Sequence, residues 1–275
     1  MELYNSTNLL CSKLITNRYS TSFSLGIKAL HNKFRMSVYA IYGFVRFADE
    51  IVDTFHDSDK AELLKEFKKE TYLAINRGIS LNPVLHSFQF VVNKFGIERE
   101  LIDAFLDSME ADLLDKKHDH NSYNTYIYGS AEVVGLMCLR VFCEGNKVQY
   151  DSLKPFAQRL GAAFQKVNFL RDVKSDYQER GRVYFPGVNF SGFSTEAKNS
   201  IESDIAEDFK ISLQGIKKLP MGSRFGVYLA YVYYKSLFNK IKRMPVARIQ
   251  NERVRIPDQE KFLLFIESWV KYKFI

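Results

Sequence analysis

The sequence predicts an all-α fold that forms one domain over residues 1–275. Three observations support this prediction. Glycine and proline are scarce, with 14 and 6 residues in 275, whereas turn-rich all-β folds need many of both. Apolar residues recur at helical spacing along most of the chain, and no segment alternates convincingly over several strands. No stretch has the composition of a long flexible linker, so we expect a single structural unit.

Eight segments show the helical period, and most are bounded by residues that interrupt helices. The first four predicted helices are 35–55, 60–77, 84–95 and 98–115, with breaks at Gly78 to Pro83 and at Gly96. The last four are 123–143, 149–177, 198–217 and 223–243, with breaks at 118–122, Gly145-Asn146, Gly181 to Ser194 and Pro220 to Gly222.

The composition excludes some functional classes. Lys and Arg number 39 against 32 Asp and Glu, which gives a net charge of +7 and a pI of about 9.1. The basic residues are scattered, and the densest stretch, 240–255, carries no zinc-finger spacing or RNA-recognition signature. We therefore interpret that stretch as a solvated basic face and expect no nucleic-acid partner. The aromatic content of 15% predicts a bulky interior with an apolar cavity.

The cysteines and the N-terminal residues indicate the compartment. Cys11, Cys138 and Cys143 form no C-x-x-C pair, so we expect neither a disulfide framework nor a zinc site. No basic start followed by an apolar run marks a signal peptide. The longest apolar stretch, 225–234, is too short to span a membrane. We expect a soluble, cytoplasmic protein.

Aspartate recurs at i, i+4 spacing six times, at positions 49/53, 53/57, 103/107, 115/119, 172/176 and 204/208. Like charges at this spacing mildly destabilise a helix, so spacing alone does not establish a function. For 103/107, 115/119 and 204/208 the surrounding residues form ordinary polar helix faces, which predicts solvated surface. The pairs 49/53 and 172/176 differ in context, since the first lies in a largely apolar segment and the second shares its helix face with Gln165 and Asn168.

The first of these two segments places Tyr42, Arg46, Asp49 and Asp53 on one helix face. Their steps of 4, 3 and 4 residues keep them within an arc of about 60°. The intervening residues are almost entirely apolar, so we expect this helix to be buried on most sides. Aspartates in such a setting are costly unless something neutralises them.

The second segment places Gln165, Asn168, Asp172 and Asp176 on one face, within an arc of about 80°. Amide and carboxylate oxygens are the ligands that Mg²⁺ prefers. Two facing carboxylate stripes can hold a cluster of Mg²⁺ ions around a diphosphate, while an apolar cavity shelters the carbocation left behind. Buried salt bridges to neighbouring arginines are the structural alternative.

Five blocks, in order along the chain, resemble the phytoene/squalene synthase family, the head-to-head isoprenoid synthases. They are Ser20-Thr21-Ser22-Phe23, the segment from Tyr42 to Asp53, Tyr126-Ile127-Tyr128-Gly129-Ser130-Ala131-Glu132-Val133-Val134-Gly135, the segment from Leu160 to Asp176, and Gly181-Arg182-Val183-Tyr184-Phe185-Pro186. The resemblance covers most of the chain. It implies an isoprenoid-synthase-type helical bundle around a central apolar cavity.

The resemblance also implies roles for individual residues. The implied metal ligands are Asp49, Asp53, Asn168, Asp172 and Asp176. The implied substrate-binding residues are Ser20, Ser22, Phe23, Gln165, Arg171 and Arg253. The residues implied to contact the diphosphate, orient the cation or assist proton removal are Tyr42, Arg46, Tyr128 and Tyr184. Tyr234 fits a Y-x-x-L pattern, but Tyr233 beside it leaves that assignment open.

The implied reaction is a Mg²⁺-dependent prenyl transfer that uses two or three ions, with Mn²⁺ as the alternative ion and no NADPH. We favour condensation of two geranylgeranyl diphosphates, through cyclopropyl prephytoene diphosphate, to phytoene in carotenoid biosynthesis. One alternative is a dehydrosqualene or squalene synthase that uses farnesyl diphosphate. Another is a non-catalytic relative acting as an assembly protein, which the four intact aspartates disfavour. Release of an insoluble hydrocarbon predicts peripheral contact with the inner face of the membrane, and the oligomeric state is left open.

Three positions depart from the family pattern. Glu132 stands where the family usually has Gly, and it puts a carboxylate on a helix expected to lie against substrate. Ser175 stands where Glu is common, and Glu50 stands where a second Asp often occurs. The last two changes leave the i, i+4 aspartates intact.

Overall fold

The computed structural model describes residues 1–114, 119–182, 184–188 and 193–272, and these ranges contain helices and loops but no β-strand. The all-α prediction is therefore confirmed. The helices in chain order are α1 (Glu2–Tyr19), α2 (Thr21–Lys28), α3 (Asn32–Asp53), α4 (Lys60–Arg77), α5 (Pro83–Phe95), α6 (Arg99–Ala111), α7 (His120–Ile127), the π-helical turn η1 (Tyr128–Glu132), α8 (Val133–Cys143), α9 (Lys147–Arg180), α10 (Thr195–Lys218), α11 (Met221–Lys242), α12 (Val246–Ile249) and α13 (Asp258–Tyr272).

All eight predicted helices are present, with ends that shift by a few residues. The predicted helix 123–143 is divided, because η1 widens the turn between α7 and α8. The predicted helix 98–115 ends early, at Ala111, and Asp115 of the 115/119 pair lies outside the described residues. The sequence did not predict α1, α2, α12 or α13.

Helix ends follow the local capping chemistry. Asp59 accepts a hydrogen bond from the backbone N–H of Glu62 at the start of α4, which satisfies a donor that has no partner inside the helix. Asn82 caps α5 in the same way and is followed by Pro83 at the first helical position. Gly78 ends α4 with a φ of 70°, in the left-handed region that glycine adopts without strain.

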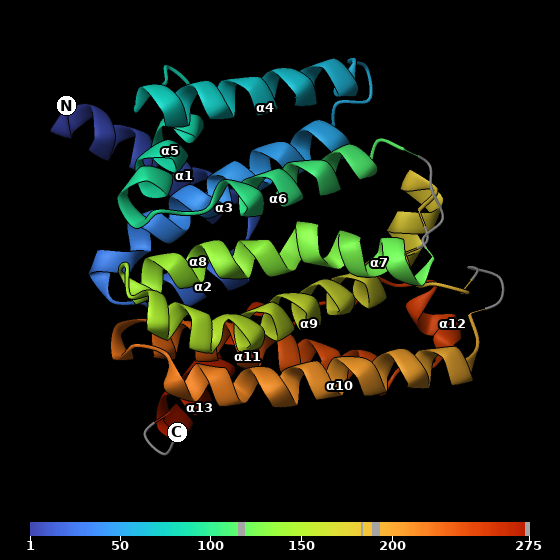
Figure 1. The fold of residues 1–275 in the computed structure, drawn as a ribbon. Helices are drawn as coiled ribbons and strands as arrows, with labels where there is room; N and C mark the ends of the chain where they lie inside the picture. Colours follow the sequence, from blue (N-terminus) through green and yellow to red (C-terminus); the bar gives the residue numbers. More distant parts are fainter. Residues whose placement is uncertain (115–118, 183, 189–192, 273–275) are drawn as a thin grey trace.

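The helices form layers around one long central helix, α9 (Figure 1). On one side α9 packs against η1 and α8, and on the other it packs against α10 and α11. The second long core helix, α3, packs against α1, α5 and α8. The two helices that carry the predicted aspartate stripes therefore both border α8.

The π-helical turn fits between α6 and α9 because two glycines allow the close approach. A Cβ on Gly161 of α9 would lie 2.7 Å from the carbonyl oxygen of Ala131. A Cβ on Gly129 would lie 2.4 Å from the carbonyl oxygen of Ala104 in α6. The stretch His120–Cys143 is long and apolar enough to cross a membrane by length and composition, but more than half of its most apolar window is buried inside the protein.

For the aspartate pair 204/208 the prediction of solvated surface is wrong at Asp208 and confirmed at Asp204, whose side chain is 53% exposed. Asp208 is 1% exposed, and its carboxylate lies 2.7 Å from Lys166 Nζ and 3.0 Å from Arg159 Nη1. Asp204 Oδ2 lies 2.5 Å from the same lysine. Residue spacing within α10 could not show that Lys166 of the neighbouring helix α9 pairs with both aspartates. For the pair 103/107 the prediction is confirmed at Asp107, which is largely exposed.

Candidate active site

A cavity of about 750 Å³ lies between α2, α3, η1, α8, α9 and α11. Its polar lining comes mainly from the C-terminal parts of α3 and α9. Most of the remaining wall is apolar and includes Ile27, Leu30, Val38, Leu139, Phe142, Leu153, Phe156 and Leu219. An apolar chamber with a polar end suits a ligand that has a charged head and a long hydrocarbon tail.

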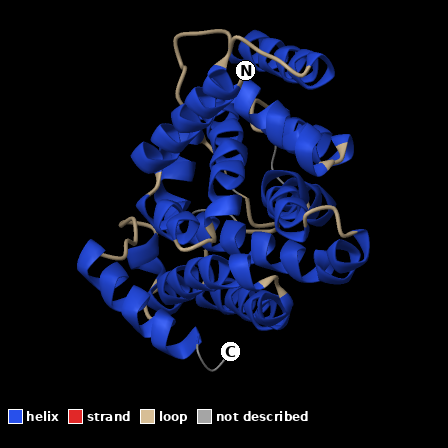
Figure 2. Cartoon of the chain, turned by 90° about the vertical axis from the view of Figure 1, so that its left-hand side faces the viewer, coloured by secondary structure: helices blue, strands red, loops and turns tan. Residues whose placement is uncertain are grey.

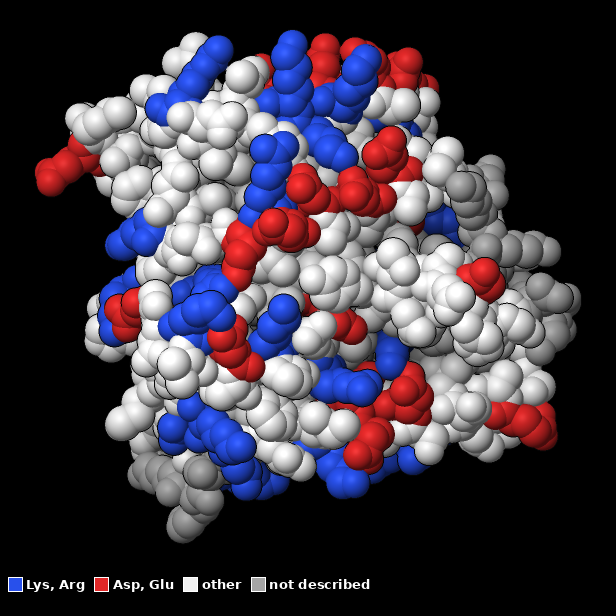
Figure 3. Space-filling model, viewed as in Figure 1, with Lys and Arg blue, Asp and Glu red and all other residues white. Residues whose placement is uncertain are grey.

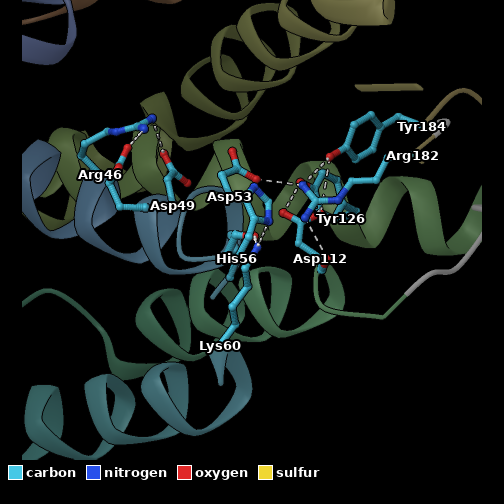
Figure 4. A network of polar contacts seen from close by, with 11 residues as sticks. Arg46, Asp49, Asp53, His56, Lys60, Asp112, Tyr126, Arg182 and Tyr184 are labelled. Carbon is cyan, nitrogen blue, oxygen red and sulfur yellow. Dashed lines mark hydrogen bonds and ion pairs between the residues drawn. The ribbon is translucent and has the colours of Figure 1, made fainter. Parts of the chain in front are cut away.

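The α3 stripe is assembled as predicted, since Tyr42, Arg46, Asp49 and Asp53 all line the cavity. Figure 4 shows Arg46 and Asp49 turned toward one another, with Nη1 and Oδ2 3.8 Å apart. Arg46 also forms an ion pair with Glu50. Its Nε is buried and has no hydrogen-bond acceptor among the described residues.

Burial sets the electrostatics of this stripe. It raises the pKa of Asp49 to about 7; Arg46 opposes the rise, whereas Asp53 and Asp112 add to it. The Asp49 side chain is about a third exposed (32%), and it lines the cavity. A cation entering the cavity would favour the ionised carboxylate, so this position suits a metal or another positive group.

The α9 stripe is also assembled, since Gln165, Asn168, Asp172 and Asp176 line the same cavity. Two arginines hold Asp172. Arg171 Nη2 lies 2.5 Å from Asp172 Oδ2, and Arg253 Nε lies 2.7 Å from Asp172 Oδ1.

The amides of the α9 stripe are fixed by a short chain of hydrogen bonds. Gln165 Nε2 donates to Ser130 Oγ at 3.2 Å, and Asn168 Nδ2 donates to Gln165 Oε1 at 3.4 Å. The Tyr234 hydroxyl donates to Asn168 Oδ1 at 3.3 Å. Tyr233 donates instead to the carbonyl of Lys261. Of the two neighbouring tyrosines, Tyr234 is therefore the one that lies at the site.

A fifth aspartate, Asp112, joins the site and was not predicted from the sequence. Arg182 Nη1 lies 3.0 Å from Asp53 Oδ1, and Arg182 Nη2 donates to the Asp112 carbonyl at 2.8 Å. The Tyr126 hydroxyl donates to Asp112 Oδ2 at 2.8 Å, and Tyr184 lies beside the same carboxyl (Figure 4). Burial raises the pKa of Asp112 to about 6, while Arg182 and the Tyr126 hydrogen bond oppose the rise.

Four aromatic rings form a cluster at the cavity wall. Phe23 lies 5.8 Å from Tyr42 and 5.7 Å from Tyr234, measured between ring centroids. Phe164 stacks on Tyr234 at 3.9 Å. Burial raises the pKa of Tyr42 to about 12, so its hydroxyl stays protonated at neutral pH. Aromatic faces stabilise a nearby cation without reacting with it.

The structure places all predicted site residues at the cavity except Ser22 and Tyr128. Ser20, the N-cap of α2, and Phe23 in the first turn of that helix line the cavity, whereas Ser22 does not. Tyr126 faces the cavity, so Tyr128, two residues later, points away. The position of Tyr128 therefore does not support the prediction that it orients the cation, and Tyr126 lines the cavity instead.

Glu132 does not face the cavity, although it lies on the helix that we expected to lie against substrate. It is absent from the cavity lining, whereas its neighbours Ser130 and Ala131 belong to it. The Glu132 carboxylate accepts a hydrogen bond from Gln158 Nε2 at 2.8 Å. Burial raises the pKa of Glu132, and the Gln158 hydrogen bond opposes the rise. At the end of the η1 turn, the Glu132 side chain therefore points toward Gln158 of α9 and not into the cavity.

The donor set suits Mg²⁺ because the two stripes offer carboxylate and amide oxygens. Within the described ranges, no three Asp, Glu, His or Cys side chains converge closely enough to form a metal site. Arginines engage carboxylates of both stripes instead. The oxygen atoms of these side chains are therefore of the type that binds Mg²⁺, and in this structure the carboxylates form the salt bridges that we gave as the alternative.

The chain was compared with known proteins. The family described as "Squalene/phytoene synthase" matches residues 16–260. A 4,4'-diapophytoene synthase from Staphylococcus haemolyticus is 24% identical over 268 residues, which cover 94% of this chain and 92% of that protein. A phytoene synthase from Arthrospira platensis is 25% identical over 280 residues, which cover 90% and 88%.

Solved structures share the fold. A dehydrosqualene synthase in complex with ligand superposes with a TM-score of 0.84 at 22% identity and covers 98% of both chains. A squalene synthase from Alicyclobacillus acidocaldarius superposes with a TM-score of 0.76 at 17% identity and covers 91% of this chain and 97% of that chain. At this identity, the likeness to solved structures establishes the helical architecture.

Proposed function

The chain belongs to the squalene/phytoene synthase family, and we propose that it condenses two geranylgeranyl diphosphates head to head to form phytoene. The family places it among the prenyltransferases that act on prenyl diphosphates. The observation that carries the proposal is the pair of carboxylate stripes, from α3 and α9, that line one largely apolar cavity.

The polar end of the cavity would bind the diphosphates and Mg²⁺. Asp49 and Asp53 on α3 and Asn168, Asp172 and Asp176 on α9 would hold a cluster of two or three ions. When bound, Mg²⁺ neutralises diphosphate oxygens and so assists their departure as a leaving group.

The arginines of the site would then exchange partners. Arg46, Arg171 and Arg253 now engage carboxylates of the two stripes. Once a cation holds those carboxylates, the guanidinium groups become available to the diphosphate oxygens, which they can bind in a bidentate manner.

The reaction needs two ionisations. In the first, the C1–O bond of one substrate breaks, and its allylic cation is captured by the C2–C3 double bond of the second. Loss of a proton gives a cyclopropylcarbinyl diphosphate. In the second, the remaining diphosphate leaves, the cation rearranges, and loss of another proton gives a central triene. No electrons enter, so this route uses no NADPH.

The wall of the cavity would protect the cations. The rings of Phe23, Tyr42, Phe164 and Tyr234 line it beside the α9 stripe and can stabilise positive charge. Tyr126 and Tyr184, which both lie beside Asp112, are positioned to orient the substrate or to pass a proton on.

Farnesyl diphosphate is the second candidate substrate. Two comparisons favour it. The dehydrosqualene synthase structure superposes over 98% of both chains, and the match to the 4,4'-diapophytoene synthase covers 94% of this chain. The longer substrate is favoured by the phytoene synthase match.

Hydrocarbon analysis tests the proposal. Purified protein is incubated with Mg²⁺ and each prenyl diphosphate, with and without NADPH. We expect a C40 triene from geranylgeranyl diphosphate, independent of NADPH. A C30 product from farnesyl diphosphate, with no product from geranylgeranyl diphosphate, would show that farnesyl diphosphate is the substrate instead. No hydrocarbon from either substrate would overturn it.

A further inference from the structure

The C-terminal helix α13 presents an apolar face to solvent. Phe262, Leu263, Ile266 and Val270 are 65%, 65%, 45% and 48% exposed. Their spacing puts them within an arc of about 100° on one side of the helix. We call these four residues the α13 apolar face.

The opposite side of α13 is fixed to α11. The rings of Phe225 and Phe265 lie 6.0 Å apart, and those of Phe225 and Tyr272 lie 5.1 Å apart. The Tyr233 hydroxyl donates to the Lys261 carbonyl at 3.0 Å. Figure 2 shows the helix that leads to the C-terminus at the edge of the molecule. The helix is therefore anchored on one side and displays large apolar side chains on the other.

An exposed apolar helix face of this size indicates an interaction surface. Single exposed apolar residues are normal on a protein surface, but four large ones on one helix face form a contiguous patch, which commonly marks an interaction site. The site described above does not use it, because none of the four residues lines the cavity.

Basic residues lie at both ends of this face. At its start, Lys240 Nζ donates to the carbonyl of Arg255, and Arg255 precedes α13 by three residues. At its end, Lys271 lies in the last turn, where it forms an ion pair with Glu267 of the same helix. Lys217 and Lys218 end α10, just before the α11 segment that contacts Tyr272. Figure 3 shows Lys and Arg side chains gathered where α10 ends, near the C-terminus.

We propose that α13 docks the protein on an anionic lipid bilayer, with its apolar face in the headgroup region. A helix anchored to a protein, apolar on its outer side and flanked by Lys and Arg, matches the chemistry of that interface. The net charge of +7 adds a long-range attraction to anionic lipid. The docking stands whichever prenyl diphosphate the enzyme uses.

The position of α13 relative to the cavity gives the docking a use. Arg253, which contacts Asp172 at the cavity, precedes α13 by five residues. A short segment of chain therefore joins the docking helix to a residue of the site. An apolar product released there would meet a solvent in which it dissolves.

The chain carries its own reporter for the test, because Trp269 is its single tryptophan and lies on α13, 52% exposed. Full-length protein is mixed with phosphatidylcholine vesicles, with or without phosphatidylglycerol. We expect a blue shift of the tryptophan emission with the anionic vesicles and quenching when their lipids carry brominated acyl chains. Absence of both effects would overturn the proposal. A blue shift that grows with protein concentration without lipid, together with a doubled mass, would identify a second copy as the occupant and would also overturn it.

A matched pair of variants locates the contact. Ile266→Glu places a charge in the α13 apolar face, and Leu81→Glu places one at a leucine that is 93% exposed outside it. In vesicle flotation we expect Ile266→Glu to lower the bound-to-free ratio about tenfold or more, and Leu81→Glu to leave it unchanged. Both should keep the wild-type far-UV circular dichroism and diphosphate release in detergent solution. Equal flotation of the wild type and Ile266→Glu would contradict docking by α13, whatever the outcome of the activity assay.

Discussion

Replacing Asp112 by asparagine should cost activity without costing stability. The Asp112 side chain is 7% exposed, and burial raises its pKa from the ordinary value of 3.8 to about 6. A carboxyl with a raised pKa binds a proton more readily in the folded state than in the unfolded state. Its ionised form therefore disfavours folding. This cost is absent below the unfolded value of 3.8, grows as the pH rises, and is complete above about 6.

The magnitude follows from the size of the shift. A rise from 3.8 to about 6 corresponds to about 3 kcal/mol at about 1.4 kcal/mol for each pH unit. Asparagine is neutral at every pH, and its side-chain oxygen still accepts the hydrogen bond that Tyr126 donates. Exchanging a charged acceptor for a neutral one costs about 1–2 kcal/mol. The free energy of unfolding at about pH 8 should thus be unchanged or higher by up to about 2 kcal/mol.

Activity should respond in the opposite direction. Arg182 lies between Asp53 and the Asp112 carboxyl, and loss of one negative charge changes the position and field of its guanidinium at the cavity. Removal of a preorganised charge contact lowers turnover by about tenfold or more. Asp107→Asn, in helix α6 just before Asp112 but largely exposed, is the matched control and should change neither quantity.

Urea unfolding at about pH 5 and about pH 8, together with diphosphate release, tests this reasoning. The wild type should lose stability between the two pH values relative to Asp112→Asn. A variant that unfolds more easily than the wild type at the higher pH, by more than about 2 kcal/mol, would refute the reasoning. It would show that the ionised carboxylate holds the fold together.

Three further predictions follow from the same contacts. Asp208→Ala should lower the free energy of unfolding by about 3 kcal/mol, because it removes a buried partner of Lys166; an unchanged urea midpoint would contradict this. Tyr126→Phe should lower kcat severalfold and Tyr128→Phe should not, since only Tyr126 lines the cavity; equal steady-state kinetics of the two variants would refute that placement. Glu132→Gln should keep kcat and product within about twofold of the wild type, because the side chain points away from the cavity; a changed product profile would show otherwise.

The sequence predicts the helices of the core well because their buried positions are apolar and periodic. Helix α1 escapes detection because the residues it buries are polar, namely Asn8, Ser12 and Thr16. Ser12 packs against Gly43 of α3, a contact that a hydrophobicity pattern does not show. Helix α13 escapes for the opposite reason, since the consecutive apolar run 262–266 has no helical period.

The site is predicted to the extent that its residues share one helix face. The two aspartate stripes follow from their spacing together with the residues around them, and they line one cavity. Asp112 could not be found in this way, because it stands just after α6 with no carboxylate four residues away. Its role depends on Arg182 from a distant loop. The direction of Glu132 depends on the π-helical turn, which widens the helix without a marker in the spacing.

The central claim is that the facing carboxylates serve diphosphate departure through Mg²⁺. Diphosphate release from geranylgeranyl diphosphate, measured for the wild type and Asp172→Asn with Mg²⁺ and with a chelator, tests it most directly. We predict Mg²⁺-dependent release by the wild type, at two diphosphates for each hydrocarbon formed. Release should fall at least about a hundredfold in Asp172→Asn and stop when the chelator is added. Turnover by Asp172→Asn at the wild-type rate, or release that continues in the chelator, would contradict the claim.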